Sequence, residues 1–271
     1  MPELPDLTVV AEELAARATG RRVVQATAPT PILVRATPEQ LASLKGTRLG
    51  RARRRGKFLL LPFERDGTAE SLLAANPMLA GRFWLLERAG RVRARTGLRL
   101  HLDVGELRYV DQEMLGKLYV VAPDRLDAIP GWTEMGPDAD DPALTLDVFR
   151  QRIRRHPGEL KPLLRNSRFV AGIGNAYSDE ILWEARLAPF RRRSTLRPEE
   201  VDRLYEAMRR VLADATERLR ALVPPNIETQ HREFLKVHLR GGQPCPRCGK
   251  PLRQIGGAEA TTFCRTCQPP M

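Results

Sequence analysis

The chain has 271 residues, of which 42% are hydrophobic and 29% charged, and its 45 Lys and Arg residues exceed its 33 Asp and Glu residues by 12. This composition excludes a collagen-like chain, a fully disordered chain and a disulfide-stapled miniprotein, and the length predicts about two domains. The positive charge favours a polyanionic partner such as nucleic acid, although an arginine-rich genome would produce the same excess. No stretch approaches the ~18 apolar residues of a membrane span and no signal peptide is evident, so we expect a cytoplasmic protein without membrane contact.

The first half of the chain is predicted to be one helix followed by strands. Leu7, Val10 and Leu14 recur at helical spacing after Asp6, which we interpret as the N-cap, and Gly20 follows as a stop. From about residue 23 to residue 121, short β-like runs alternate with glycine-containing turns. That spacing predicts a β-sandwich or a barrel.

The second half is predicted to be helical and to follow a linker. Pro, Gly and Asp are dense over residues 129–142, which disfavours both a helix and a ladder. Helices are then expected over residues 145–155 and 160–164, from Asn175 onward, and as a long amphipathic segment over residues 201–219.

All four cysteines lie near the carboxyl end of the sequence, as the pairs Cys245–Cys248 and Cys264–Cys267. Two CxxC pairs in a reducing compartment are typical of one tetrahedral zinc ion held by four thiolates. A closed four-cysteine site leaves no open coordination position, so we expect one structural zinc ion per chain. A redox role for the CxxC pairs is the alternative.

The segment Ala-Gly-Ile-Gly-Asn, which ends at Asn175, combines a glycine turn with the start of a helix. Backbone N–H groups and the helix dipole at such a start form an anion site, for which a phosphate is the natural ligand. A structural turn between packed helices explains the same residues.

The amino terminus offers a candidate nucleophile. Removal of Met1 would leave Pro2 with a free secondary amine, and an α-amino pKa of roughly 8 keeps part of it neutral. Such an amine can form a Schiff base, and Glu3 beside it could transfer protons; an ordinary entry into the first helix is the alternative. Five of the residues from 51 to 57 are basic, which indicates a solvated basic face or a phosphate track.

Together these motifs resemble the formamidopyrimidine-DNA glycosylase/endonuclease VIII family. The resemblance rests on Met-Pro-Glu-Leu-Pro at the start, Arg-Arg-Arg-Gly-Lys-Phe-Leu-Leu around Lys57, Val-Ala-Gly-Ile-Gly-Asn-Ala-Tyr-Ser-Asp-Glu ending at Glu180, and the two cysteine pairs, all in the family's order. It implies a multidomain α+β fold. Its expected parts are an N-terminal catalytic β-sandwich domain with flanking helices (1–131), a linker (132–142), a helix–two-turns–helix DNA-binding domain (143–225), and a C-terminal zinc finger built on a β-hairpin (236–271).

The resemblance also implies a bifunctional DNA glycosylase and AP lyase that acts as a monomer on double-stranded damaged DNA in base excision repair. In that scheme the damaged nucleotide is flipped out, Pro2 attacks the sugar C1′ as the base leaves, and the imine undergoes β- and δ-elimination. Glu3 matches the family's general acid/base, Lys57 its phosphate- or lesion-contacting lysine, and Asn175 its phosphate-binding asparagine. Further expected DNA contacts are Lys161, Glu180 and Arg55.

Two departures from the family pattern concern the base stack. Asn76 stands where the family has a histidine, and we expect it to remain a DNA contact. The side chain expected to fill the vacated stack is Leu79, or Met78 if the register shifts, with core packing as the alternative. Glu113 stands where purine-specific members place an arginine opposite the orphaned cytosine, which removes a bidentate partner for a base edge.

A third departure concerns the zinc hairpin, where Glu259 replaces the arginine that grips phosphate and only Arg253 or Arg265 could substitute. The stretch 222–234 is also short, which indicates a lesion preference other than classical 8-oxoguanine recognition. We favour the enzyme because Pro2 stands with Glu3 and Lys57. The alternative is a catalytically weakened damaged-DNA-binding protein on the same scaffold; an RNA-binding zinc-ribbon protein would leave the amino-terminal motif unexplained.

Overall fold

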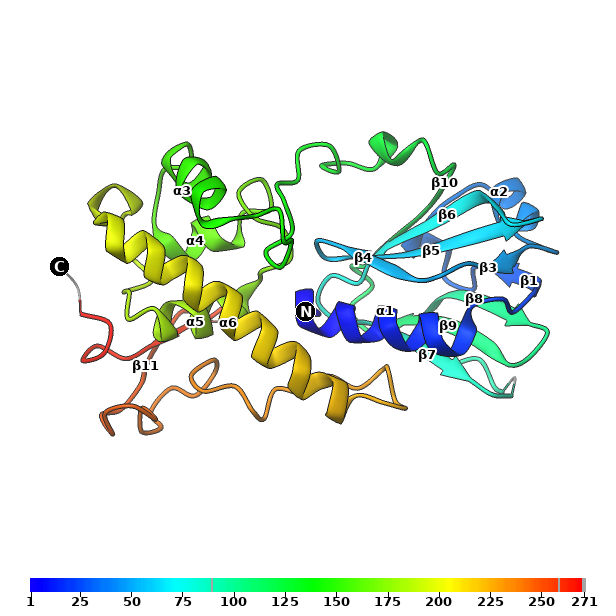
Figure 1. The fold of residues 1–271 in the computed structure, drawn as a ribbon. Coiled ribbons are helices and arrows are strands. Elements are labelled where there is room, and N and C mark those ends of the chain that lie inside the picture. The colour runs from blue at the N-terminus through cyan, green and yellow to red at the C-terminus, as the bar shows by residue number, and fades with distance from the viewer. Residues whose placement is uncertain (89, 258, 270–271) are drawn as a thin grey trace. The chain divides into compact units, whose positions relative to one another are not determined.

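The structure is a computed structural model that describes residues 1–88, 90–257 and 259–269. The chain forms two compact units, whose elements are labelled in Figure 1. Unit 1 comprises Met1–Thr133 and Arg218–His231, and unit 2 comprises Glu134–Glu217 and Arg232–Met271. Among the described residues, no helix is both long and apolar enough to cross a bilayer.

Unit 1 contains the amino-terminal helix and all of the longer strands. Its helices are α1 (Leu4–Ala18) and α2 (Pro38–Ser43), with short 3-10 turns at Pro31–Leu33 and Leu126–Ala128. Its strands are β1 (Val23–Thr27), β2 (Val34–Arg35), β3 (Arg48–Leu49), β4 (Arg53–Arg55), β5 (Phe58–Arg65), β6 (Thr68–Asn76), β7 (Gly81–Leu86), β8 (Thr96–Leu102), β9 (Glu106–Asp111) and β10 (Lys117–Val121).

These strands form two sheets, which confirms the β-sandwich. One sheet has the order β1-β8-β9-β7, and the other has the order β2-β10-β6-β5-β3 with β4 paired to β5. All pairings are antiparallel except that of β2 with β10. Strand β5 runs through five consecutive buried residues, Leu59 to Phe63, because it lies between neighbours inside its sheet.

Helix α1 begins earlier than the sequence predicted, so the assignment of Asp6 as N-cap was wrong. Glu3 is the N-cap, and Asp6, the third helical residue, accepts the Glu3 backbone N–H on its carboxylate over 2.8 Å. This reciprocal capping box satisfies N–H groups at the helix start that have no helical partner. Because Pro5 has no N–H to lose, it is also tolerated in this first turn.

Unit 2 begins with a helical part, whose elements fall where the periodicity predicted them. Its helices are α3 (Leu146–Arg154), α4 (Leu160–Arg165), α5 (Asn175–Glu184) and α6 (Pro198–Leu222), with a 3-10 turn at Arg193–Thr195. Thr145 caps α3 by accepting the Val148 N–H over 3.3 Å. The last residues of α6 belong to unit 1.

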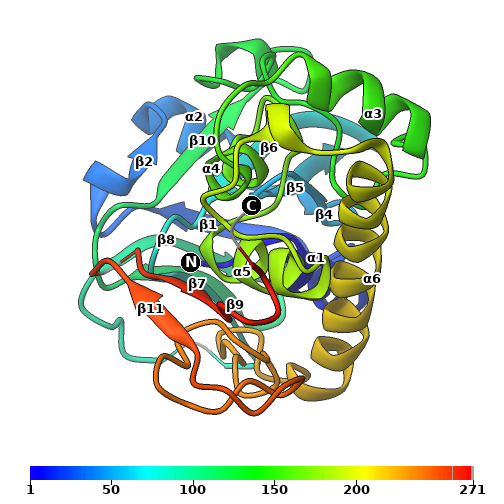
Figure 2. The same cartoon turned by 90° about the vertical axis from the view of Figure 1, so that its left-hand side faces the viewer.

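The cysteine-bearing end of the chain folds onto helix α5 within unit 2. Strands β11 (Arg253–Ile255) and β12 (Thr261–Phe263) form an antiparallel hairpin, and Figure 2 shows this hairpin and the segment before it near α5. Trp183 of α5 packs with Val237 and Leu252 against Cys245 and Cys264. The hairpin region therefore has a small core of its own.

Candidate nucleic-acid interface and metal centre

The candidate nucleophile and its proton-transfer partner lie at the first turn of α1. Glu3 is 1% exposed, so its carboxylate is shielded from bulk solvent. Pro2 is also buried, and Met1 precedes it. With Met1 attached the Pro2 nitrogen is an amide, so its use as a nucleophile requires removal of Met1.

The surroundings of Pro2 are formed within unit 1 by β7 and by the segment after α6. Pro2 lines a small hollow of about 20 Å³ together with Phe83 and Ile227. Gln230 donates from its side chain to the Met1 carbonyl over 3.2 Å and accepts from Arg82 over 2.6 Å. Loss of Met1 would therefore remove a hydrogen-bond partner of Gln230, which lines the same hollow.

Lys57 lies in the two-residue turn between β4 and β5, in which Arg55 faces Phe58. Arg54 connects this turn to α1: its Nε donates to the Thr8 hydroxyl over 3.0 Å and its Nη1 donates to the Gly56 carbonyl over 3.2 Å. Lys57 and Arg55 are both half-buried. The basic run is therefore a structured hairpin fastened to α1, and Arg54 has a positioning role that the sequence did not indicate.

The loop between β6 and β7 presents an apolar side chain to the surface. Asn76 accepts the Met78 N–H on its side-chain oxygen over 3.1 Å, and Met78 has a φ of 49°, in the left-handed region. Leu79 at the tip is 48% exposed. Asn76 shapes this loop, and DNA contact by Asn76, Met78 or Leu79 stays a prediction.

A second loop, after β9, begins beside the first because Gly81 pairs with Asp111. The Tyr109 hydroxyl lies 3.4 Å from the Pro77 carbonyl oxygen and from Asp111 Oδ2, so one buried ring supports both loops. A Cβ at Gly116 would lie 1.8 Å from the Tyr109 hydroxyl, which explains the glycine.

The tip of this second loop carries Glu113, Met114 and Leu115. Glu113 is exposed, while Met114 is 39% and Leu115 45% exposed. The sequence did not indicate these two apolar side chains as candidates for contact with a base stack. In the sequence they are an apolar pair between Asp and Gly turn residues. Such a pair occurs both at a surface loop tip and at a buried strand end, so the pattern does not distinguish the two.

The glycine turn before α5 has the geometry that the sequence predicted. Gly172 has a φ of 104°, which favours glycine, and Gly174 is the N-cap of α5. The Asn175 amide nitrogen donates to the Ala260 carbonyl, next to β12, over 3.2 Å, and its oxygen Oδ1 is buried without a hydrogen-bond partner among the described residues. The turn thus meets the hairpin at the positive end of the α5 dipole.

Lys161 and Glu180 lie in the interior of unit 2. Lys161 Nζ lies 2.7 Å from Asp179 Oδ1 and donates to the Ala260 carbonyl over 3.2 Å. The Glu180 carboxylate accepts the consecutive backbone N–H groups of residues 236–238, each over 2.8 Å, and burial raises its pKa. The structure therefore gives both side chains structural contacts, and DNA contact by them stays a prediction.

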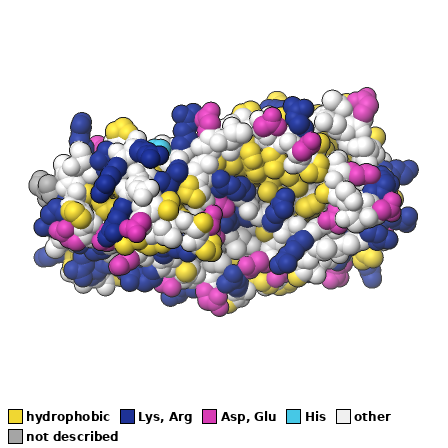
Figure 3. All heavy atoms as spheres, turned by 45° about the horizontal axis from the view of Figure 1, so that its top comes forward, with side chains coloured by type: hydrophobic (Ala, Val, Ile, Leu, Met, Phe, Trp, Pro, Cys, Tyr) yellow, Lys and Arg dark blue, Asp and Glu magenta, His cyan; other side chains and the backbone are white. Residues whose placement is uncertain are grey.

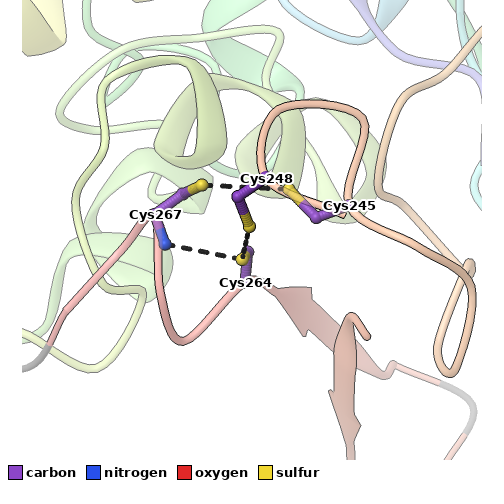
Figure 4. Close-up of side chains that lie close together, drawn as sticks. All are labelled: Cys245, Cys248, Cys264 and Cys267. Atoms are coloured by element: carbon purple, nitrogen blue, oxygen red, sulfur yellow. Dashed lines mark hydrogen bonds between the residues drawn. The ribbon is translucent and has the colours of Figure 1, made fainter. Parts of the chain in front are cut away.

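The four cysteines converge as the spacing predicted (Figure 4). Their sulfur atoms all lie within 4.8 Å of one another. Cys248 Sγ is 3.4 Å from Cys264 Sγ, and Cys245 Sγ is 3.9 Å from Cys267 Sγ. Four soft donors in one small cluster suit a metal ion such as zinc, and within the described part of the chain no carboxylate or histidine joins the set.

Protonation of these thiols depends on their surroundings. Burial raises the pKa of Cys267 to about 12 and also raises the pKa of Cys264. Burial acts against the Cys245 thiolate too, but the Trp183 indole N–H, 3.4 Å away, and backbone N–H groups lower its pKa to about 6. A bound cation is therefore needed to hold all four sulfurs as thiolates at neutral pH.

Glu259, the acidic residue at the hairpin tip, forms an ion pair. Arg165, the last residue of α4, donates to Glu259 over 2.8 Å, and Glu259 is 67% exposed. Arg253 and Arg265, the candidate substitutes for the missing arginine, are both exposed. Pairing with Arg165 reduces the repulsion that an unpaired Glu259 would exert on a phosphate.

The two-sheet unit, the glycine turn that opens α5 and the four-cysteine hairpin together define a two-unit protein of the helix–two-turns–helix class. Family models agree over most of the chain: the formamidopyrimidine-DNA glycosylase N-terminal domain matches residues 1–118, and the formamidopyrimidine-DNA glycosylase H2TH domain matches residues 135–223. The chain belongs to the formamidopyrimidine-DNA glycosylase family.

Curated relatives and solved structures support this assignment over the full length. A formamidopyrimidine-DNA glycosylase of Pelotomaculum thermopropionicum is 32% identical over 99% of both chains, and one of Thermus thermophilus is 35% identical over 99% of this chain and 98% of its own. A Lactococcus lactis Fpg variant in complex with Fapy-dG containing DNA superposes with a TM-score of 0.89 at 26% identity, over 99% of this chain and 100% of that chain. MutM in complex with carbocyclic 8-oxo-G containing DNA gives a TM-score of 0.87 at 26% identity over the same shares.

Proposed function

We propose that this protein is a base-excision-repair DNA glycosylase with AP lyase activity that removes oxidised or ring-opened bases from double-stranded DNA. The observation that carries the proposal is the start of α1, where Pro2 is the residue that removal of Met1 would expose as an amine and the buried Glu3 caps the helix beside it. A protein that only binds DNA has no need of a proline amine next to a desolvated carboxyl group.

In the proposed reaction the Pro2 amine attacks C1′ of the damaged nucleotide, the base leaves, and an imine joins the enzyme to the opened sugar. Glu3 transfers the protons that the departing base and the opening sugar require, at a position fixed by its bond to Asp6. Lys57, held in the β4–β5 turn by Arg54, supplies a cation for a phosphate or for the lesion. Removal of the C2′ proton from the imine then breaks the strand by β-elimination, and δ-elimination follows.

Extrusion of the damaged nucleotide is assigned to the two neighbouring loops of unit 1. Leu79 and Leu115, both close to half exposed, are apolar wedges that fit between base steps after a nucleotide leaves the stack. Glu113 on the same tip has no hydrogen to donate to the edge of the opposite base. We therefore propose that the protein discriminates only weakly between the bases that can stand opposite the lesion.

We assign the contacts with the DNA phosphate backbone to unit 2. The α5 start with Asn175 receives a phosphate, and the hairpin that carries Ala260 supports this asparagine. Zinc held by the four cysteines would keep the hairpin folded, with no part in the chemistry. We further propose that the protein acts as a monomer in the bacterial cytoplasm.

The alternative, a damaged-DNA-binding protein with weakened catalysis, is supported by Glu113 and by the charge reversal at Glu259. The pairing of Glu259 with Arg165 makes this alternative weaker, because the tip is less repulsive than its sequence indicates.

A lesion panel tests the proposal. Duplexes that contain 8-oxoguanine, a formamidopyrimidine, thymine glycol, a hydantoin or an abasic site are incubated with the zinc-loaded protein, and strand cleavage is measured beside Pro2→Gly as the control. We expect β- and δ-elimination products from the abasic duplex and from at least one base lesion, with little base excision by the variant. Tight binding without cleavage on any duplex would instead support the alternative.

A further inference from the structure

Unit 2 contains a second hollow that the proposed reaction does not use. It has a volume of about 580 Å³ and is lined by Ala188, Phe190, Arg192, Ile255, Phe263 and Arg265, among others. We call it the hairpin groove. Its size is that of a pocket for a small molecule or for two or three side chains of a peptide.

The walls of the hairpin groove are apolar and open to solvent. Phe190 is 43% exposed and its ring meets Phe263 edge-on, with centroids 5.6 Å apart. Ile255 on β11 is 50% exposed. Three large apolar side chains are strongly exposed among the described residues of unit 2, namely Phe190, Ile255 and Leu239. Two of them, Phe190 and Ile255, line the hairpin groove.

The rim of the hairpin groove is positive. Arg192 and Arg265 are exposed and make no side-chain ion pair within the described part of the chain, whereas Arg191 is neutralised by Glu200 at 2.7 Å. A neighbouring hollow shares Arg191 and adds Arg186, Arg197 and Arg203, of which the last two lie near Glu200 in the same hollow. Figure 3 shows that Lys and Arg side chains are common on the visible face of the molecule, so the distinguishing feature here is the apolar hollow among them.

We propose that the hairpin groove binds an acidic segment of a partner protein whose apolar side chain enters the hollow. Carboxylates match the unpaired guanidinium groups of the rim, and a leucine or phenylalanine fills a space that a DNA backbone, which offers only sugar and phosphate, would leave wet. The partner is thus a protein with a short acidic and apolar motif. The groove gives the repair protein a means of recruitment that is separate from base excision.

The test uses fluorescence anisotropy with the zinc-loaded full chain and a labelled peptide, Asp-Glu-Asp-Gly-Leu-Phe. Two matched peptides carry Ser-Ser in place of Leu-Phe, or amides in place of the carboxylates. We expect micromolar binding of the first peptide and at least tenfold weaker binding of each control. Equal binding of all three peptides, or no binding of the first, would overturn the proposal.

Variants locate the binding on the protein. Arg192→Glu and Ile255→Ser should each weaken binding of the first peptide about tenfold, which corresponds to about 1.4 kcal/mol. Arg155→Ser, at an exposed arginine after α3, is the control and should change nothing. Zinc content and cleavage of an abasic duplex, measured on all three variants, verify that they are folded. Unchanged binding by both groove variants would refute the site.

A competition experiment separates this site from the DNA surface. An unlabelled abasic duplex at saturating concentration should leave the peptide bound, because Arg265 is the one groove residue that is also a candidate phosphate contact, and Arg192 and the apolar walls remain available to the peptide. Displacement of the peptide by the duplex would show that the groove belongs to the DNA-binding surface and would overturn the proposal. Failure of the lesion panel would not affect this result, since peptide binding requires no catalysis.

Discussion

The side-chain amide of Asn175 donates to the carbonyl oxygen of Ala260 over 3.2 Å, across 85 residues of sequence. The same carbonyl accepts from Lys161 over 3.2 Å. The turn that opens α5 and the hairpin that follows the first cysteine pair are therefore one structural unit. An anion site at Asn175 depends on a folded hairpin.

Metal removal is predicted to weaken DNA binding while most helices persist. Chelation leaves four unligated cysteine side chains, two of them with raised pKa values, and the hairpin loses its main cross-link. We expect abasic-duplex affinity to fall at least about tenfold, with recovery when zinc is restored; circular dichroism and anisotropy report the two properties. Because binding releases protons from Cys264 and Cys267, zinc affinity should fall as the pH falls below neutral. Undiminished DNA affinity after verified zinc loss would contradict this coupling.

Lys161→Met is predicted to destabilise unit 2. The substitution leaves the fully buried Asp179 carboxylate with the His238 ring nitrogen, 2.8 Å away, as its one side-chain partner among the described residues. Breaking a buried pair in this way costs about 3–5 kcal/mol, which urea unfolding will measure. Arg168→Met, at an exposed arginine, is the matched control. If Lys161 serves only as a DNA contact, the variant will instead unfold like the parent and bind DNA more weakly.

The pair of Arg191 and Glu200 is predicted to make stability fall in acid. Hydrogen bonds from Arg191 lower the pKa of Glu200 from 4.5 to about 2. A carboxylate with a lowered pKa stabilises the fold above its unfolded-state pKa, and the contribution is lost as the pH falls from about 4.5 towards 2. The contribution is at most about 3 kcal/mol. Glu200→Gln should therefore lose stability at pH 6 and show a flatter profile below pH 4.5; parallel profiles for the two proteins would argue against the pair.

Leu79→Ser and Leu115→Ser are predicted to slow base excision with little effect on folding. Both side chains are close to half exposed, so their removal leaves no cavity. Without an apolar wedge the vacated stack is left unfilled, and single-turnover excision should slow by about tenfold or more, since unstacking costs a few kcal/mol. Cleavage of a duplex whose abasic site lies in a single-stranded bubble should change less. Equal slowing on both substrates would argue for a general catalytic defect.

The sequence predicted those features that depend on local patterns. Helical spacing located α3 to α6, alternating apolar runs located the strands, and cysteine spacing predicted the cluster around Cys245 and Cys264. The N-cap of α1 was misplaced because Asp is a preferred N-cap residue and Glu is not, whereas the backbone conformation makes Glu3 the cap and places Asp6 inside the helix.

Features that depend on long-range pairing could not be predicted from the sequence. Arg165 meets Glu259 across 94 residues, and Arg54 reaches Thr8 on another element. The exposure of Leu115 could not be predicted either, because apolar residues occur both in the core and on the surface. Packing thus decides which polar side chains support the site and which are free to contact a ligand.

Borohydride trapping followed by peptide mapping tests the central claim most directly. The protein, with the amino-terminal sequence verified to begin at Pro2, is incubated with an abasic duplex and reduced, and the cross-linked peptide is identified by mass spectrometry. We predict one adduct, on Pro2, and its absence in a preparation that retains Met1. No adduct from the verified protein, or an adduct on a lysine side chain, would contradict the account.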